Sequence, residues 1–260
     1  MALILNDDER ALQESVRRFV ADRSPLTKLR ELMDSEWADI RDQTTYAPDR
    51  FTDDVYQRIV AGRPRLDGAR AALDYFGVPD AARRAEQYAS AKQQHMTRLI
   101  TSGQFEAFPD ALRLVLDVKG AGIRIAAASS SKNADVIMDH IQMDEFAAEQ
   151  HLDHPLIRPG LTLLGLLDAD VSGRDLPRGK PDPLIFLTAA GELGFEPRGC
   201  FVVEDAAAGV QAAKAGGMAA IGVARLGDEE ILRGAGADLV VTTLDDVSRA
   251  GLAEGRLKRP

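Results

Sequence analysis

The sequence predicts an α/β protein in which a doubly wound parallel sheet is accompanied by a small α-helical domain. Two patterns and the length of the chain support this prediction. In residues 105–260, apolar strand-like runs alternate with helical segments, as in a parallel sheet covered on both faces. Residues 36–104 contain helical patterns only, which indicates an all-helical domain. A chain of 260 residues is long enough for one large core and a small accessory domain.

The expected elements follow from apolar periodicity and from the positions of Gly and Pro. The apolar run Ala2–Leu5 is a candidate first strand within an atypical N-terminal segment, residues 1–35. Three helices are expected in residues 36–104, because Gly-Pro segments interrupt the pattern: Phe51–Ala61, Leu66–Phe76 and Ala81–Ile100. The later residues supply helix Ala111–Lys119, strand Ile123–Ala128, helices Ala134–Ile141 and Pro183–Leu193, strand Cys200–Val203, helix Ala207–Ala215, and strands Ala219–Val223 and Asp238–Val241.

Two motifs place charged groups near the carboxyl edge of the predicted sheet. The strand Cys200–Val203 runs directly into Glu204 and Asp205, and carboxylates at the end of a strand suit a divalent cation. Upstream, prolines flank Lys180 and Asp182 in Gly179-Lys180-Pro181-Asp182-Pro183, so the backbone is restricted and Lys180 can point over the sheet edge. Taken singly, the acid pair is a common helix start and Lys180 is a surface lysine.

A third motif follows the predicted strand Ile123–Ala128. Ser129, Ser130 and Ser131 come at the start of the next helix, where hydroxyls and successive backbone N–H groups form an anion site. By themselves these serines would serve as a helix N-cap, which needs no ligand. Lys132 is expected at the rim of this site.

In order and spacing, the three motifs resemble those of the haloacid dehalogenase (HAD) superfamily of phosphate-handling hydrolases, in particular its β-phosphoglucomutase-like branch. The resemblance runs from about Tyr56 to Val240. It implies a HAD-like Rossmannoid core at residues 105–260 and a helical cap at residues 36–104. It also implies a phosphatase or phosphomutase that acts through an aspartyl-phosphate on a small phosphorylated metabolite such as a sugar phosphate.

The resemblance also implies a role for each motif residue. Lys180 would neutralise the transferring phosphoryl group, Ser129 would bind its oxygens with Ser130 and Ser131 beside it, and Glu204 and Asp205 would hold Mg²⁺. Arg65 matches a cap-loop arginine that grips the second phosphate of the substrate in β-phosphoglucomutase relatives. The alternative for Arg65 is a solvated arginine that opens a helix.

The first motif of the family, a strand that ends in Asp-x-Asp, is not found. In the family its first aspartate attacks phosphorus and its second is the general acid/base. With Ala2–Leu5 as the first strand, Asn6 falls at the nucleophile position and Asp8 at the acid/base position, where Asp8 would also be a candidate metal ligand. An amide neither attacks phosphorus nor brings charge to a metal. The aspartyl-phosphate step is therefore expected to be impaired.

Other alignments of the N-terminal segment are weaker. A register based on Asp34-Ser35-Glu36 places Thr27 and Leu29 where the two aspartates belong. The run from Asp7 to Leu26 resembles the first helix of acyl-CoA dehydrogenases, although any amphipathic helix has such spacing. Two hypotheses stay open: an enzyme that recruits Asp8 or another carboxylate, and a catalytically silent relative that binds phosphate or a protein partner.

Composition restricts the partners and the location. The net charge of −9 and the pI near 5.0 argue against nucleic acid or an anionic membrane, since both attract basic proteins. The chain has a single cysteine, Cys200, so it has no internal disulfide. Cys200 falls in a predicted core strand, where a buried apolar role is expected. No apolar run approaches the length of a membrane span. We therefore expect a cytoplasmic protein with a small phosphorylated substrate and Mg²⁺ as cofactor, while the oligomeric state cannot be read from the sequence.

Overall fold

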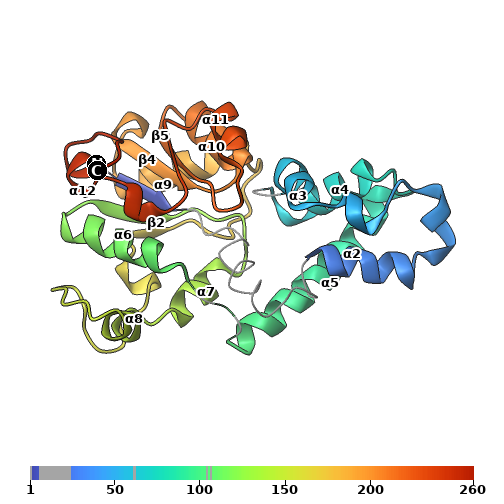
Figure 1. Ribbon diagram of the computed structural model, residues 1–260, viewed down its shortest axis with the longest axis horizontal. Helices are drawn as coiled ribbons and strands as arrows, with labels where there is room; N and C mark the ends of the chain where they lie inside the picture. The colour runs from blue at the N-terminus through green and yellow to red at the C-terminus, as the bar shows by residue number, and fades with distance from the viewer. Residues whose placement is uncertain (1, 6–24, 61–62, 104, 106) are drawn as a thin grey trace. The chain divides into compact units, whose positions relative to one another are not determined.

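A computed structural model describes residues 2–5, 25–60, 63–103, 105 and 107–260 (Figure 1). The chain divides into two compact units, which are considered separately here. The core unit comprises Met1–Ala11 and Ala107–Pro260, and the helical unit comprises Leu12–Glu106. Within the part of the chain that is described, no helix combines the length and apolar character needed to cross a bilayer.

The core unit contains a six-stranded parallel sheet with the strand order β3-β2-β1-β4-β5-β6. The strands are β1 (Ala2–Leu5), β2 (Arg124–Ala127), β3 (Ala169–Asp170), β4 (Cys200–Glu204), β5 (Ala219–Val223) and β6 (Leu239–Val241). The described helices of this unit are α6 (Pro109–Gly120), α7 (Ala134–His140), α8 (Met143–Glu149), α9 (Leu184–Leu193), α10 (Ala207–Ala215), α11 (Glu229–Gly234) and α12 (Arg249–Ala253), with 3-10 turns η3 (Leu164–Leu166), η4 (Pro197–Gly199) and η5 (Leu244–Asp246).

Alternate residues of the strands enter two separate apolar clusters, one on each face of the sheet. In β4, Phe201 and Val203 pack in the cluster that includes α6 and α12, whereas Cys200 and Val202 pack in the cluster that includes α9, α10 and α11. Successive side chains of a strand point to opposite faces, so a strand buried on both sides must be apolar throughout. The predicted doubly wound α/β fold is confirmed, and Cys200 is a buried residue of its core.

Two aspartates brace the amino edge of the sheet in the same way. Asp168 accepts the Ile125 N–H at 2.8 Å and pairs with Lys119 at 2.6 Å. Asp238 accepts the N–H of Ala220 in β5 at 2.8 Å. Each carboxylate thus satisfies the N–H of the second residue of a strand, which helps fix where the strand begins.

The helical unit contains α2 (Pro25–Asp34), η1 (Ala38–Gln43), η2 (Pro48–Arg50), α3 (Asp53–Ile59), α4 (Arg65–Tyr75) and α5 (Ala81–Thr101). Its core is aromatic: the ring centroid of Phe76 lies 5.2 Å from that of Tyr46 and 5.3 Å from that of Phe51, both edge to face. Trp37 is 1% exposed and donates its indole N–H to Gln87 at 2.9 Å. Aromatic side chains such as these bury large areas and so hold the short helices of this unit together.

Most predicted elements occur within one or two residues of their expected bounds, including β1 at Ala2–Leu5. The strand β3 and the helices α8, α11 and α12 were not predicted, because they are short and their apolar residues lie in long mixed runs. Thr27 and Leu29 lie within α2 of the helical unit, so the register that put them at the end of the first core strand is wrong. The acyl-CoA dehydrogenase-like run falls mostly outside the described residues, and the separate N-terminal segment 1–35 stays a prediction.

Candidate functional site

The central strand β1 aligns the ends of its two neighbours. Leu5 is in register with Ala127 of β2 on one side and with Val203 of β4 on the other. Ser129 and Asp205 each come two residues after those partners, so both follow strands that end at the same level. Neighbouring strands are about 4.8 Å apart, which places β2 and β4 about 10 Å from each other across β1. The serine motif and the acid motif therefore share one edge of the sheet.

Lys180 and Glu204 form a buried ion pair at this edge. The Lys180 Nζ lies 2.7 Å from Glu204 Oε1, and the two side chains are 1% and 0% exposed. The ammonium also lies 4.8 Å from the ring centroid of Phe186 on α9, which is a favourable cation–π position. Two desolvated charges are tolerated inside a protein only when they are paired. Lys180 is thus held in one place by Glu204 and by the aromatic ring.

Gly209 makes room for the Glu204 carboxylate beside helix α10. The second oxygen, Glu204 Oε2, accepts the Ala206 N–H at 3.3 Å, just before the helix starts. A Cβ atom placed on Gly209 would lie 1.9 Å from Glu204 Cδ, which no real contact allows. The small residues that follow the strand are therefore needed for close approach of the carboxylate and not only for helix packing.

The residues 129–133, here called the serine loop, connect β2 to α7. Ser129 is fully buried, and its Oγ accepts the Ser131 N–H at 3.1 Å. The Asn133 N–H in turn donates to the Ser131 Oγ at 3.2 Å. The exposed side chain of Lys132 pairs with Asp175 at 2.6 Å, and its place at the rim of a phosphate site stays a prediction. The loop is thus a turn stabilised by its own side chains.

The donor set near the end of β4 is compatible with Mg²⁺. Mg²⁺ usually uses one or two protein carboxylates and completes its octahedral shell with water and substrate phosphate. Asp205, which follows the strand, and Glu204 would be the residues that hold it. Among the described residues no three His, Cys, Asp or Glu side chains form a metal-binding group. Asp8, the third predicted metal ligand, lies outside the described residues.

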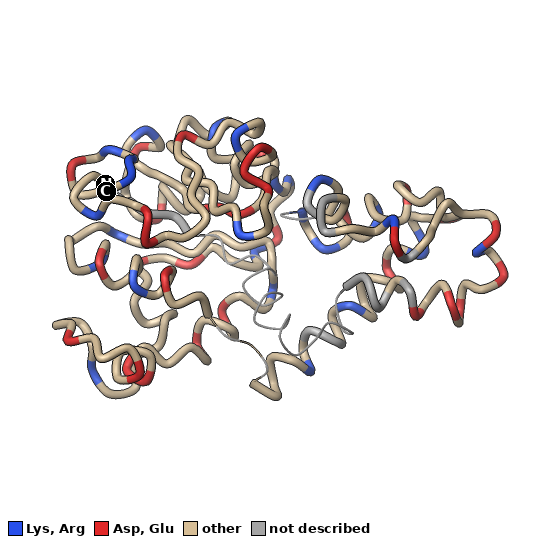
Figure 2. The backbone as a smooth tube through the Cα atoms, in the orientation of Figure 1, with Lys and Arg blue, Asp and Glu red and all other residues tan. Residues whose placement is uncertain are grey.

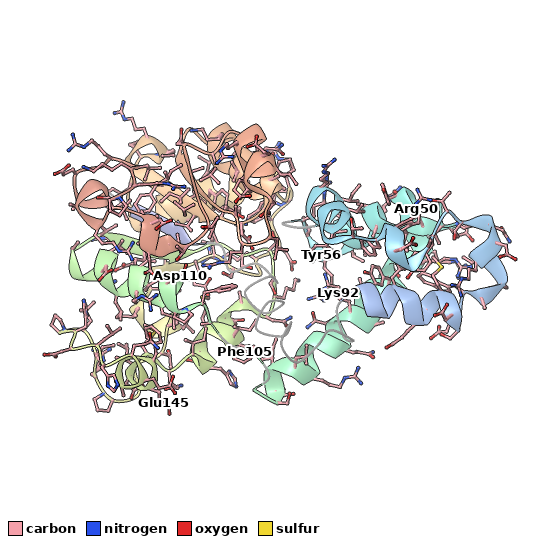
Figure 3. The ribbon with its side chains drawn as sticks, viewed as in Figure 1. Arg50, Tyr56, Lys92, Phe105, Asp110 and Glu145 are labelled. Carbon is pink, nitrogen blue, oxygen red and sulfur yellow. The ribbon has the colours of Figure 1, made fainter. Side chains whose placement is uncertain are left out.

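A second buried ion pair lies at the same sheet edge and was not predicted. Asp110, labelled in Figure 3, lies in the first turn of α6. Its two carboxylate oxygens accept hydrogen bonds from Arg225 Nη2 at 2.9 and 3.0 Å. It also accepts the Thr243 hydroxyl at 2.9 Å and the Leu244 N–H at 2.8 Å. The guanidinium of Arg225 lies 3.8 Å from the ring centroid of Phe108. This network ties together the start of α6 and the loops after β5 and β6.

The protonation of Asp110 reflects these contacts. Burial acts to raise its pKa, but the hydrogen bonds and charge of Arg225, with the bonds from the loop after β6, outweigh burial and lower the pKa below the ordinary aspartate value. No sequence pattern links Asp110 to Arg225, which are 115 positions apart. The pair could be found only from the folded chain.

The other predicted site residues stand as follows. Ser130 is in the serine loop beside Ser129, whereas Asn6 and Asp8 lie outside the described residues. Arg65 is the first residue of α4 in the helical unit. Its assignment to a second phosphate stays a prediction, because the two units are described separately. In Figure 2, acidic and basic residues are interspersed along the described parts of both units, in keeping with the moderate net charge.

Comparison with known proteins gives the family. A model described as haloacid dehalogenase-like hydrolase matches residues 9–217. The chain belongs to the haloacid dehalogenase-like hydrolases. A β-phosphoglucomutase from Mycobacterium bovis is 31% identical over 205 residues, which cover 74% of this chain and 72% of that enzyme. A β-phosphoglucomutase from Bacillus subtilis is 36% identical over 144 residues, and the match spans 55% of this chain and about half, 52%, of that enzyme.

Solved structures share the fold over nearly the whole chain. An archaeal β-phosphoglucomutase from Pyrococcus superposes with a TM-score of 0.59 at 23% identity, covering 98% of this chain and 99% of that one. An Asp-to-Asn mutant of CbbY from Rhodobacter sphaeroides, in complex with xylulose-(1,5)bisphosphate, gives a TM-score of 0.63 at 18% identity, covering 95% and 96%. At these identities the likeness shows the fold and no more.

Proposed function

We propose that this chain is a phosphatase or phosphomutase of the β-phosphoglucomutase and CbbY type, with a phosphate-binding site that is retained and an attacking step that is impaired. The observation that carries the proposal is the meeting of the serine loop, the Lys180–Glu204 pair and Asp205 at the end of β1. In the sequence, the next residue after β1 is Asn6. The proposed ligand is a small phosphorylated metabolite such as a sugar phosphate, in line with the names of the relatives.

The proposed binding chemistry follows from the charges at the edge. Lys180 would face the phosphoryl oxygens with its positive charge, and the serine loop would donate hydrogen bonds to them. Because Lys180 is held by Glu204 and stacked on Phe186, its position needs little reorganisation when a ligand arrives. Mg²⁺, held by Asp205 and Glu204, would supply further neutralisation of phosphate charge when bound.

The attacking step is proposed to be impaired because an amide follows β1. The register of β1 supports alignment of Asn6 with the family position from which a carboxylate attacks phosphorus. Asparagine is not a nucleophile toward phosphate esters at neutral pH.

Restoring the carboxylate tests this proposal. We expect the unmodified chain to hydrolyse sugar phosphates and an aryl phosphate near the background rate. Asn6→Asp should raise the Mg²⁺-dependent rate at least about 100-fold and a chelator should abolish it, because the change supplies a nucleophile and a metal ligand. Asn6→Gln is the matched control, since it keeps an amide at the same position and should stay near background.

Two other outcomes would change the proposal. Chelator-sensitive turnover by the unmodified chain that survives Asp8→Asn would show that another carboxylate attacks, and the impairment would be wrong. Phosphate binding without any gain of turnover in Asn6→Asp would favour the second candidate function, a catalytically silent module that binds phosphorylated metabolites or a protein partner. The asparagine after β1 is the observation in favour of this second function.

A further inference from the structure

The turn after β3, residues 171–175, packs against the serine loop. The strand pairing of β2 with β3 continues past its end, because the Val171 N–H donates to the Ala127 carbonyl at 3.0 Å. Further on, the Gly173 N–H donates to the Ser129 carbonyl at 3.0 Å. The turn therefore runs alongside the chain from β2 into the serine loop.

Between these two backbone bonds, a side chain takes the place of a strand carbonyl. The Ser129 N–H donates to the Ser172 Oγ at 3.2 Å. In a regular parallel ladder this N–H would donate to a backbone carbonyl of the neighbouring strand. Ser172 thus fixes the peptide group that carries the Ser129 N–H, and Gly173 fixes the one that carries the Ser129 carbonyl. With both peptide groups held, the turn fixes the backbone of Ser129, while its hydroxyl accepts the Ser131 N–H.

The turn is itself anchored to the core. The Ser172 N–H donates to Asp170 Oδ1 at 2.8 Å, a short-range turn contact of the kind that aspartate favours. Arg174 donates to the Asp170 carbonyl at 2.6 Å and to Glu192 Oε2 on α9 at 3.0 Å. The helix α9 also carries the aromatic ring beside Lys180. The turn therefore connects the serine loop to the helix that supports the lysine of the site.

Gly173 allows the turn to approach the serine loop closely. Its φ of +63° lies in the left-handed region that favours glycine. A Cβ atom at this position would lie 2.9 Å from the Lys132 Cα and 3.1 Å from the Ser131 carbonyl oxygen. Any side chain would push the serine loop away from the turn and disturb the two bonds to Ser129.

We infer that Ser172 is a positioning residue for phosphate binding: it holds the Ser129 N–H so that the serine loop meets a phosphoryl group in one arrangement. This inference rests on the proposed function, because it assigns a purpose to the geometry of the same site. Ser172 acts through Ser129 and needs no contact with the ligand. Its loss should therefore weaken ligand affinity through Ser129, and rescue by a residue that keeps the hydroxyl distinguishes this effect from a general loss of stability.

The experiment measures the affinity for inorganic phosphate by calorimetry with Mg²⁺ present, together with the thermal unfolding midpoint. Ser172→Ala should weaken phosphate binding about 5- to 10-fold, as for the loss of one ordered hydrogen bond. Ser172→Thr keeps the hydroxyl and should restore the affinity. Thr188→Ala is the matched control, since it removes a hydroxyl that donates to the Leu184 carbonyl within α9 and should leave phosphate affinity unchanged.

A second variant and a reference variant make the outcomes distinct. Gly173→Ala should weaken binding more than Ser172→Ala, because it displaces the loop itself. If Ser129→Ala loses phosphate while Ser172→Ala and Gly173→Ala bind like the unmodified chain, the positioning role is wrong and the proposed function stands. If the unmodified chain does not bind phosphate, or Ser129→Ala binds equally well, the proposed function fails and the positioning role fails with it.

Discussion

Two buried ion pairs among the described residues of the core unit lie at the same edge of the sheet but differ in what surrounds them. Asp110 is enclosed by donors from Arg225, Thr243 and Leu244, which belong to two other loops. Glu204 is paired with Lys180. Glu204 is the last residue of β4, the strand next to β1, and it directly precedes Asp205. The first pair joins segments that are distant in sequence, whereas the second fixes a lysine where the predicted ligand would bind.

This difference indicates separate roles. A buried ion pair adds little net stability over an apolar contact, but removal of one partner is costly because a charge is left without compensation. Asp110 receives several hydrogen bonds in addition to its cation, so its network can stabilise the joined loops. Under the proposed function, the Lys180–Glu204 pair would keep an ammonium fixed and desolvated for an anion.

The largest effect is expected from Gly209→Ala. The new Cβ would overlap the Glu204 carboxylate, so the ion pair with Lys180 would have to open. We expect a loss of about 3–5 kcal/mol in unfolding free energy, the range for a broken buried pair, together with strongly weakened phosphate binding. Chemical denaturation and calorimetry measure the two quantities.

Gly191→Ala provides the control for this change. Gly191 lies inside α9, and a Cβ there meets nothing within 4 Å. Alanine is the better helix former by about 0.5–1 kcal/mol, so this variant should be slightly more stable and bind phosphate normally. Equal behaviour of the two alanine variants would contradict the close contact between Gly209 and Glu204.

A smaller effect is expected from Arg225→Ala, which removes the cation of the other pair. Because Arg225 is 16% exposed and Asp110 keeps its other donors, we expect a loss of about 2–3 kcal/mol, somewhat below the cost for a fully buried pair. Phosphate affinity should not change. Arg233→Ala, which opens the exposed pair with Glu230, should change stability little and serves as the control. A large loss of phosphate affinity in Arg225→Ala would remove the distinction between the two pairs.

The smallest effect concerns the pH dependence of stability. The folded-state pKa of Asp110 is lowered, so its stabilising contribution is complete above the unfolded-state value of about 3.9 and is lost as the pH falls through the folded-state value. Stability measured by denaturation should fall on acidification below about pH 5, and Asp110→Asn should reduce the slope of that fall. Parallel curves for the two proteins would show that Asp110 does not titrate as a stabilising group.

Much of the fold could be predicted because strands that are buried on both faces are apolar throughout. The run from Cys200 to Val203 and the short run Ala2–Leu5 could be identified as strands on this basis, and both are in the sheet. By contrast, β3 has only two residues, Ala169 and Asp170, and pairs at the outer side of β2. No periodicity exists in so short an element, so only its tertiary partner defines it.

The site could be predicted in part. Residues adjacent to strand ends, such as Ser129 and Asp205, could be placed at one edge because the strands were predicted to be parallel. The partner of Lys180 could not, because no sequence pattern links Lys180 to Glu204, which is 24 positions away and forms the ion pair with it. The supporting role of Ser172 was also missed, since its hydroxyl bonds to a residue 43 positions away.

The sequence by itself determined most of the elements and which strands end in residue types suited to phosphate and a metal, because apolar periodicity and strand-end chemistry are local properties. It also determined that Asn6 follows the first strand. Only the tertiary structure decided that β1 lies between β2 and β4, that Glu204 holds Lys180, and that Asp110 meets Arg225. These contacts join residues far apart in the chain, and such pairings depend on how the helices and strands pack together and not on the residues next to them.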